Sequence, residues 1–186
     1  MEFRLTYDGP LRAAGNNSNR KEQKHEIRMS LHPQLCQLWR THPGLKQLQG
    51  IWQQKCLITR ESWSFLPLVT SQRSLHCHLT ILFLRPGSPG KLICDGGDID
   101  NRLKTLFDAL RAPKSSELPC TNPPGGGVIC VLLEEDSLIT GFDVETDQLL
   151  GGEAGGGPAK DSSHVRLVIQ VSVKNAQSVM GYGLLA

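Results

Sequence analysis

Two stretches of the chain alternate between apolar and other residues over most of their length, and this alternation constrains the fold more than any other feature. Residues 74–84 (SLHCHLTILFL) carry apolar side chains at every odd position from 75 to 83, and residues 164–175 (HVRLVIQVSVKN) do so from 165 to 173. Successive side chains of a strand point to opposite faces of a sheet. The pattern therefore predicts two strands, each with one buried face.

Apolar spacing predicts the other strands and the helices. Apolar residues alternate in residues 1–7 (MEFRLTY), which predicts a half-buried strand that ends at Gly9 and Pro10. VICVLL at 128–133 is typical of a buried strand, and SLITGFDVE at 137–145 is expected to form a paired strand after it. Apolar residues at helical spacing predict a helix from about Leu31 to the stop at Pro43, with Pro33 in its first turn, and a second helical stretch over 45–52.

The segments between these elements are rich in polar residues, glycine and proline. Residues 11–28 predict a polar, basic loop, and residues 113–127 and 151–162 predict flexible insertions. A chain of 186 residues is long enough to bury one core. We therefore expect a single small domain over 1–186, of α/β (α+β) class, in which a mixed β-sheet packs against helices.

Charge is distributed unevenly along the chain. Residues 1–75 hold 11 Lys and Arg against 5 Asp and Glu, whereas residues 76–186 hold 9 against 13. A basic half suggests attraction to a polyanion, and an acidic half suggests metal binding. No run is apolar enough to span a membrane, the N-terminus does not resemble a signal peptide, and the six cysteines form no Cys-x-x-Cys pair. We expect a cytoplasmic protein with reduced thiols and no membrane partner.

The stretch GDIDNRLKTLFDALR at 97–111 predicts a helix over 99–111 that carries charged residues beside its apolar stripe. Asp100, Lys104 and Asp108 recur every four residues, and Asp98 precedes them. Asp98 could simply cap the helix, and Asp100 could interact with the helix dipole. A second interpretation is a site for a divalent cation completed by Asp136, because carboxylates from different elements are the ligands that Mg²⁺ takes in phosphodiester chemistry.

These residues resemble the RusA family of Holliday junction resolvases. The resemblance rests on Asp98-Ile99-Asp100-Asn101, on Lys104, on Asp108-Ala109-Leu110 and on the acidic pair with isoleucine in EEDSLI (134–139), and it extends over about 74–174. It implies a dimeric, Mg²⁺-dependent endodeoxyribonuclease, with Mn²⁺ as a substitute, that resolves four-way DNA junctions in recombination and repair. By resemblance, the metal ligands would be Asp98, Asp100 and Asp136, the catalytic lysine would be Lys104, and Asn101, Asp108 and Glu135 would support the site.

This chain departs from the family pattern at three points. Glu135 stands where the family has aspartate, 27 residues separate Asp108 from Asp136, and the glycine-rich segment 151–157 is an unusual connection. Long surface insertions cost little in loop-closure entropy, so the fold can tolerate such a segment. An alternative to the nuclease is therefore a RusA-like module that binds nucleic acid or a protein partner without catalysis.

Several other residues have both a functional and a structural interpretation. The basic residues Arg12, Arg20, Lys21, Lys24 and Arg28 are candidates for contacts with DNA phosphates, or they belong to a solvated loop and helix start. His76 and His78 resemble metal ligands, but strand alternation sends Cys77 to the opposite face. Trp39 and Trp52 lie in apolar helical stripes and are expected in the core, whereas the sequence assigns Trp63 neither to the core nor to base stacking.

Overall fold

The computed structural model describes residues 1–13, 17–47, 50–86, 99–119, 127–150 and 163–175. Within them lie seven strands: β1 (Glu2–Pro10), β2 (Ile58–Arg60), β3 (Trp63–Val69), β4 (Leu75–Arg85), β5 (Val128–Leu133), β6 (Ile139–Gln148) and β7 (His164–Asn175). The helices are α1 (Asn17–Thr41), α2 (Pro43–Lys46), α3 (Ile51–Cys56) and α4 (Ile99–Leu110), with 3-10 turns η1 (Ser71–Arg73), η3 (Ser115–Glu117) and η5 (Asp136–Leu138). The expected α+β class is confirmed.

The larger sheet has the strand order β1-β7-β4-β6. Strand β7 pairs antiparallel with β1 and with β4, whereas β6 runs parallel to β4. Leu79 pairs with Val171 and Ile81 pairs with Ile169, so the alternating apolar residues of β4 and β7 lie on the same face of the sheet. All four of these side chains are fully buried. The alternation that dominates the sequence is thus the inner face of this sheet.

The smaller sheet has the order β2-β3-β5, with β3 antiparallel to β2 and parallel to β5. Its residues Trp63, Phe65, Ile129 and Val131 build a second apolar cluster with Leu118. Trp63 is 2% exposed and stacks on Phe65, which places it in the core.

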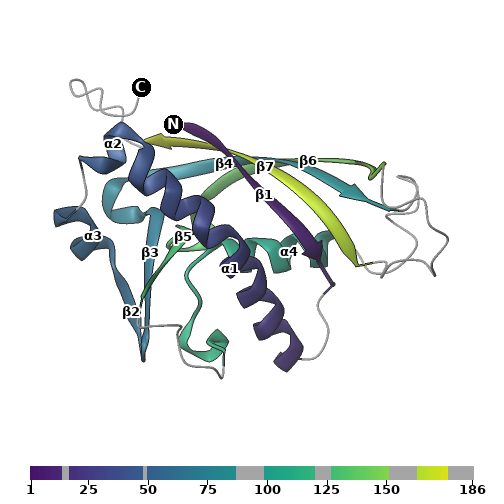
Figure 1. Ribbon diagram of the computed structural model, residues 1–186, viewed down its shortest axis with the longest axis horizontal. Helices are drawn as coiled ribbons and strands as arrows, with labels where there is room; N and C mark the ends of the chain where they lie inside the picture. The colour runs from purple at the N-terminus through teal and green to yellow at the C-terminus, as the bar shows by residue number, and fades with distance from the viewer. Residues whose placement is uncertain (14–16, 48–49, 87–98, 120–126, 151–162, 176–186) are drawn as a thin grey trace.

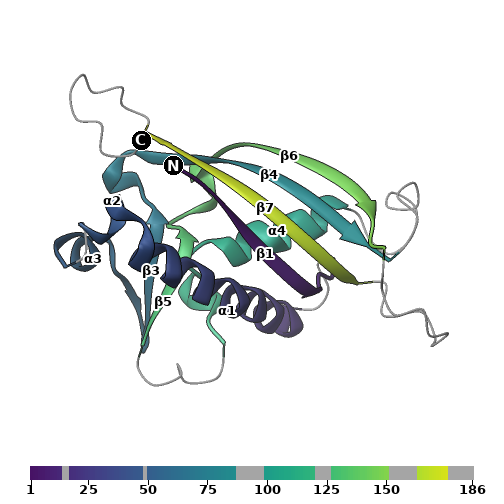
Figure 2. The same ribbon diagram turned by 45° about the horizontal axis from the view of Figure 1, so that its top comes forward.

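Helices α1 and α4 lie on the same side of the four-stranded sheet (Figures 1 and 2). Leu31 and Leu35 of α1 and Leu106 and Leu110 of α4 are buried in one cluster with the inner face of the sheet. The apolar stripe of α4 is therefore buried, as its helical spacing predicts. The side of α4 that carries Asp100, Asn101 and Lys104 is exposed.

Most predicted elements are confirmed. Strands β1, β4, β5 and β7 and helix α4 coincide with the predicted strands at 1–7, 74–84, 128–133 and 164–175 and with the predicted helix at 99–111. The predicted strand at 137–145 begins as η5 and continues as β6, which pairs with β4. Strand alternation at 75–78 buries Cys77 and leaves His76 and His78 partly exposed.

The prediction of a polar loop over 11–28 is wrong, because α1 begins at Asn17 and runs for 25 residues. Pro33 accordingly lies inside the helix and not in its first turn. The first half of α1 has few apolar residues, yet Ile27 and Arg28 are buried in it. Contacts with distant charged residues stabilise this half, as the next section describes. Strands β2 and β3 were not predicted at all.

The two predicted insertions lie largely outside the described residues. The described part of 113–127 includes η3, and Pro113 and Leu118 within it are buried. This start of the segment is therefore packed, in contrast to the flexible insertion that its composition predicts. Segment 151–162 and the side chain of Trp52 also lie outside the description, whereas Trp39 is buried as expected. In the described part of the chain, no helix is long and apolar enough to cross a membrane.

Candidate functional site

The first two turns of α4 present polar side chains to solvent. Asp100 is in the first turn, where a carboxylate interacts favourably with the helix dipole. Lys104 follows one turn later on the same side, at a spacing that brings Cβ atoms within about 5–6 Å of each other. Asp100, Asn101 and Lys104 are all exposed. An acid and a base thus lie side by side where a substrate phosphate could reach them.

The acids that follow β5 differ from one another in their environment. Glu134 accepts hydrogen bonds from the backbone N–H and the Oγ of Ser71, both at 2.8 Å, and this ties the end of β5 to η1. Glu135 is exposed and precedes η5. Asp136 begins η5 and has a side chain that is 55% exposed. Of these three, Asp136 and Glu135 are available to a ligand.

Asp136 lies near the C-terminal end of α4. Its Oδ2 is 4.0 Å from Nε of Arg111, the residue directly after the helix, and Arg111 forms an isolated parallel bridge with Leu133 at the end of β5. Arg111 follows Asp100 by eleven positions, which corresponds to about 16 Å of helical rise. Asp100 and Asp136 therefore belong to different ends of α4.

A shared Mg²⁺ would require carboxylate oxygens at about 2.0–2.1 Å from one ion. In the part of the chain that the structure describes, Asp100, Glu135 and Asp136 do not form a group whose ligand atoms all lie within 4.8 Å of one another, and His32, Cys36 and Cys130 are the group that does. Asp98 lies outside the described residues. The carboxylate chemistry suits a hard cation, but the described geometry does not gather the predicted ligands.

Asp108 has a structural role. Its Oδ2 lies 2.7 Å from Nζ of Lys24, and its Oδ1 accepts a hydrogen bond of 2.8 Å from Nη2 of Arg111. Glu117 completes the network, at 2.8 Å from Arg111 and 3.0 Å from Lys24. Beneath it, Arg28 donates to the backbone carbonyls of Asp108 and Arg111. We call Lys24, Asp108, Arg111 and Glu117 the buried ion-pair network. Asp108 thus anchors α4 to Lys24 of α1.

Burial and charge act together on the pKa values in this network. Burial would raise the pKa of Glu117, but hydrogen bonds from Arg111, from the Lys114 backbone and from Lys24 lower it to about 2. For Arg28, burial is the main cause that lowers the guanidinium pKa to about 10, although Glu117 acts in the opposite direction. These charges are compensated inside the protein.

The expected DNA-binding role is wrong for two of the five basic residues. Arg28 is only 2% exposed and donates to backbone carbonyls, so it cannot reach a phosphate. Lys24 is held between Asp108 and Glu117, and its side chain is 13% exposed. Arg12 is exposed, and Arg20 and Lys21 are partly exposed. These three remain candidates for phosphate contacts.

Sequence reasoning missed two groups of residues. Lys24, Arg28, Leu31 and Leu35 fall at i, i+4, i+7 and i+11, so the helical stripe could have been extended toward the N-terminus. The approach of Cys130 to His32 and Cys36 carried no local signal, because the two cysteines are 94 positions apart in the sequence. Comparisons with protein-family models, with curated proteins and with solved structures gave no significant match for this chain.

Proposed function

We propose that this protein is a Mg²⁺-dependent endonuclease of the RusA type that acts on branched DNA. The observation that carries the proposal is the division of α4 into two sides. Leu103, Leu106 and Leu110 enter the core, whereas Asp100 and Lys104 of the same helix are exposed. Two of the residues that the resemblance assigns to catalysis, Asp100 and Lys104, are thus accessible to a DNA strand.

Each of these side chains has a defined task in the proposal. By resemblance, Asp98, Asp100 and Asp136 would hold a Mg²⁺ ion that supplies Lewis-acid chemistry, which requires Asp136 to approach Asp100 from its place beside Arg111. Lys104 places an ammonium group next to the developing negative charge on the phosphate or on the leaving oxygen. Asn101 orients the phosphodiester through its side-chain amide. Arg12, Arg20 and Lys21 attract the backbone without reading sequence. A two-fold homodimer would match the symmetry of a four-way junction.

A specific observation favours a second candidate, a module that binds branched DNA or a protein partner without cutting. Asp136 lies by Arg111, at the end of α4 that is remote from Asp100. If Asp136 stays there when DNA binds, the third carboxylate is missing from the metal site. The two candidates make different predictions for the same protein.

The test is a cleavage assay on a synthetic four-way junction with Mg²⁺, alongside a binding assay in Ca²⁺. The nuclease proposal predicts cleavage by the wild type and loss of cleavage with retained binding in Asp100→Asn. Asp147→Asn, an exposed position on β6, is the matched control and should behave as the wild type. Junction binding without cleavage would favour the second candidate, and full cleavage by Asp100→Asn would reject the assigned site.

A further inference from the structure

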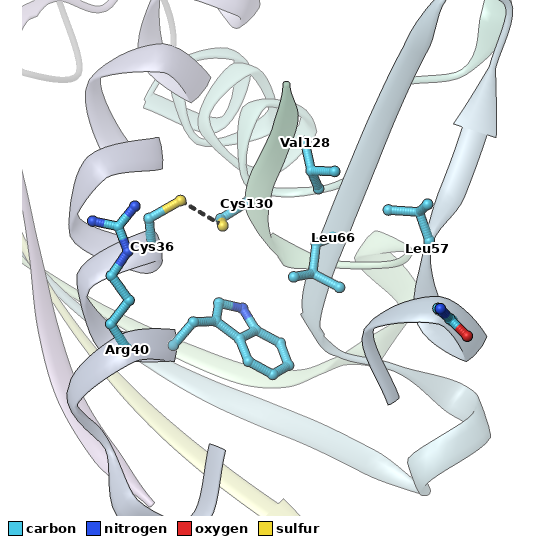
Figure 3. A pocket seen from close by; sticks show the side chains of 8 residues that line it. Cys36, Arg40, Leu57, Leu66, Val128 and Cys130 are labelled. Atoms are coloured by element: carbon cyan, nitrogen blue, oxygen red, sulfur yellow. Dashed lines mark hydrogen bonds between the residues drawn. The ribbon is translucent and has the colours of Figure 1, made fainter. Parts of the chain in front are cut away.

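Three side chains with reactive atoms meet between α1 and β5. His32 and Cys36 lie one turn apart on α1, and Cys130 comes from β5. The two Sγ atoms are 2.6 Å apart, and Figure 3 shows them pointing at each other. Cys36 is partly exposed, whereas Cys130 is 5% exposed. We call His32, Cys36 and Cys130 the thiol cluster.

The sulfur separation can be compared with the two bonded arrangements that such a cluster allows. Two cysteine sulfurs bound at about 2.3 Å to one tetrahedral Zn²⁺ would lie about 3.8 Å apart. A covalent bond between them would bring them to about 2.0 Å. The observed 2.6 Å is nearer to the bonded value. The thiols are therefore closer together than a shared zinc ion would place them.

The orientation of His32 also argues against a metal ligand. The backbone N–H of Cys130 donates to Nδ1 of His32 at 2.9 Å, which occupies that lone pair. In the neutral ring this bond assigns the proton to Nε2, which then has no lone pair for a metal. Sγ of Cys36 lies 3.5 Å from Nδ1 and 3.8 Å from Nε2 of the same ring. The bond from Cys130 thus holds the His32 ring against Cys36.

A cavity of about 500 Å³ gives small molecules access to the pair. Both cysteines line it, together with Arg40 and the apolar side chains of Leu57, Leu66 and Val128 (Figure 3). Arg40 follows Cys36 by one helical turn and lines the same cavity, where its positive charge attracts an anionic ligand. Burial raises the pKa of the Cys130 thiol. Cys36 is therefore the thiol suited to attack, and Cys130 is suited to complete the reaction.

We propose that Cys36 and Cys130 are a redox-active pair that exchanges with a small anionic organic disulfide entering this cavity. The Cys36 thiolate attacks one sulfur of the disulfide RSSR, forming a bond to SR and releasing RS⁻, which takes up the proton that Cys36 has lost. Cys130 then attacks Sγ of Cys36, breaks that mixed bond and releases a second thiol, which receives the Cys130 proton. Both cysteines are oxidised, and one RSSR becomes two RSH.

This activity is independent of the proposed nuclease. The Cys36–Cys130 bond would join α1 to β5 at the wall of the cavity, and it uses neither Asp100 nor Lys104. The reverse reaction, with two molecules of RSH, restores the thiols. The class of ligand follows from the cavity, because its apolar walls and the Arg40 guanidinium suit a small molecule with carboxylate groups.

The test uses the full-length protein, reduced, desalted and equilibrated with glutathione at graded ratios of oxidised to reduced form. Intact mass, thiol alkylation and peptide mapping then follow each cysteine. We expect Cys36 and Cys130 of the wild type to lose their thiols together, with one cross-link between them and no glutathione retained on either. Cys130→Ser should accumulate glutathione on Cys36, and Cys36→Ser should leave Cys130 reduced. Cys56→Ser, at a buried position outside the cluster, should form the cross-link as the wild type does.

Three results would overturn the proposal. One is alkylation of both thiols at every glutathione ratio in a protein whose circular dichroism shows that it is folded. Another is a cross-link that joins other cysteines. A third is purified protein that carries stoichiometric zinc and forms the cross-link only after a chelator removes it, because the cluster would then be a metal site. Circular dichroism of both serine variants verifies that a missing reaction is not due to unfolding.

Discussion

The two ends of α4 carry similar residues in opposite environments. Near the N-terminal end, Asp100 and Lys104 are exposed. At the C-terminal end, Asp108 and Arg111 are enclosed with Lys24 and Glu117 in the buried ion-pair network. By resemblance, Asp100 would bind metal and Asp108 would support the site, although helical spacing alone puts both on one side of α4. Their surroundings differ, since Asp100 is exposed to solvent and Asp108 lies between Lys24 and Arg111.

The difference has a physical origin in desolvation. A buried charge is costly unless partners compensate it, and a compensated charge has little left to offer a ligand. An exposed carboxylate keeps its water and can exchange it for a cation or a phosphate-bound ion. We therefore expect substitutions at the C-terminal end of α4 to alter stability, and substitutions at the N-terminal end to alter function.

The largest effect is expected from Arg111→Met. Arg111 donates to both Asp108 and Glu117, and its side chain is 5% exposed. Its removal leaves two carboxylates without their main partner, which should lower the free energy of unfolding by about 3–5 kcal/mol. Urea denaturation measures this loss. Arg166→Met is the control, because Arg166 is 52% exposed in its pair with Asp8 and should cost at most about 1 kcal/mol.

The next prediction contrasts two lysines. Lys104→Ala should lower the rate of junction cleavage by about 10²–10³-fold, as the loss of one electrostatic donor does at an active site, and should leave the melting temperature unchanged. Lys24→Ala should lower the melting temperature and leave the cleavage rate unchanged, because Lys24 is paired with Asp108 and Glu117. Single-turnover kinetics and thermal melting of both variants provide the measurements. Equal loss of cleavage in the two folded variants would contradict the assignment of function to the N-terminal end of α4 and of stability to its C-terminal end.

The pH dependence of stability isolates Glu117. Its pKa is about 2 in the folded protein, below the ordinary value of 4.5. The stabilisation is therefore complete above about pH 4.5 and is lost as the pH falls toward 2, because the unfolded chain takes up the proton first. The expected loss is about 2–3 kcal/mol over this range. Urea titrations between pH 5 and 2 should show a smaller slope for Glu117→Gln, and an identical slope in the variant would exclude the assignment.

Periodicity predicted the parts of the fold in which apolar burial decides the structure. Apolar and other residues alternate in β4 and β7 because one face of each strand is buried, and the leucines of α4 recur at helical spacing because one side of the helix is buried. The first half of α1 has no such apolar stripe, and its partners Asp108 and Glu117 are 80 or more positions away in the sequence. Strand β3 was missed because WSFLPLV is buried on both faces for most of its length and contains Pro67. Local patterns carry no information on these distant partners.

The candidate site shows the same limit. The exposed position of Asp100 and Lys104 follows from helical spacing next to an apolar stripe. The location of Asp136 depends on where β5 ends, beside Arg111, and the intervening segment gives no local rule for that. The thiol cluster depends on the packing of α1 against β5, elements that are distant in sequence. Spacing can thus define one helix face, but it cannot define which elements meet.

The smallest expected effect is on the salt dependence of junction binding by two lysines at the start of α1. They differ in the same way as the two ends of α4, because one is partly exposed and the other is paired with carboxylates. Lys21 is partly exposed, whereas Lys24, one turn later, is held by two carboxylates. If Lys21 contacts a phosphate, Lys21→Gln should reduce the slope of log K against log salt for junction binding by about 0.9, and Lys24→Gln should leave the slope unchanged in folded protein. Fluorescence anisotropy at several salt concentrations measures both. A reduced slope for Lys24→Gln would mean that DNA competes with Asp108 for this lysine. Lys21 and Lys24 would then belong to one DNA-binding surface.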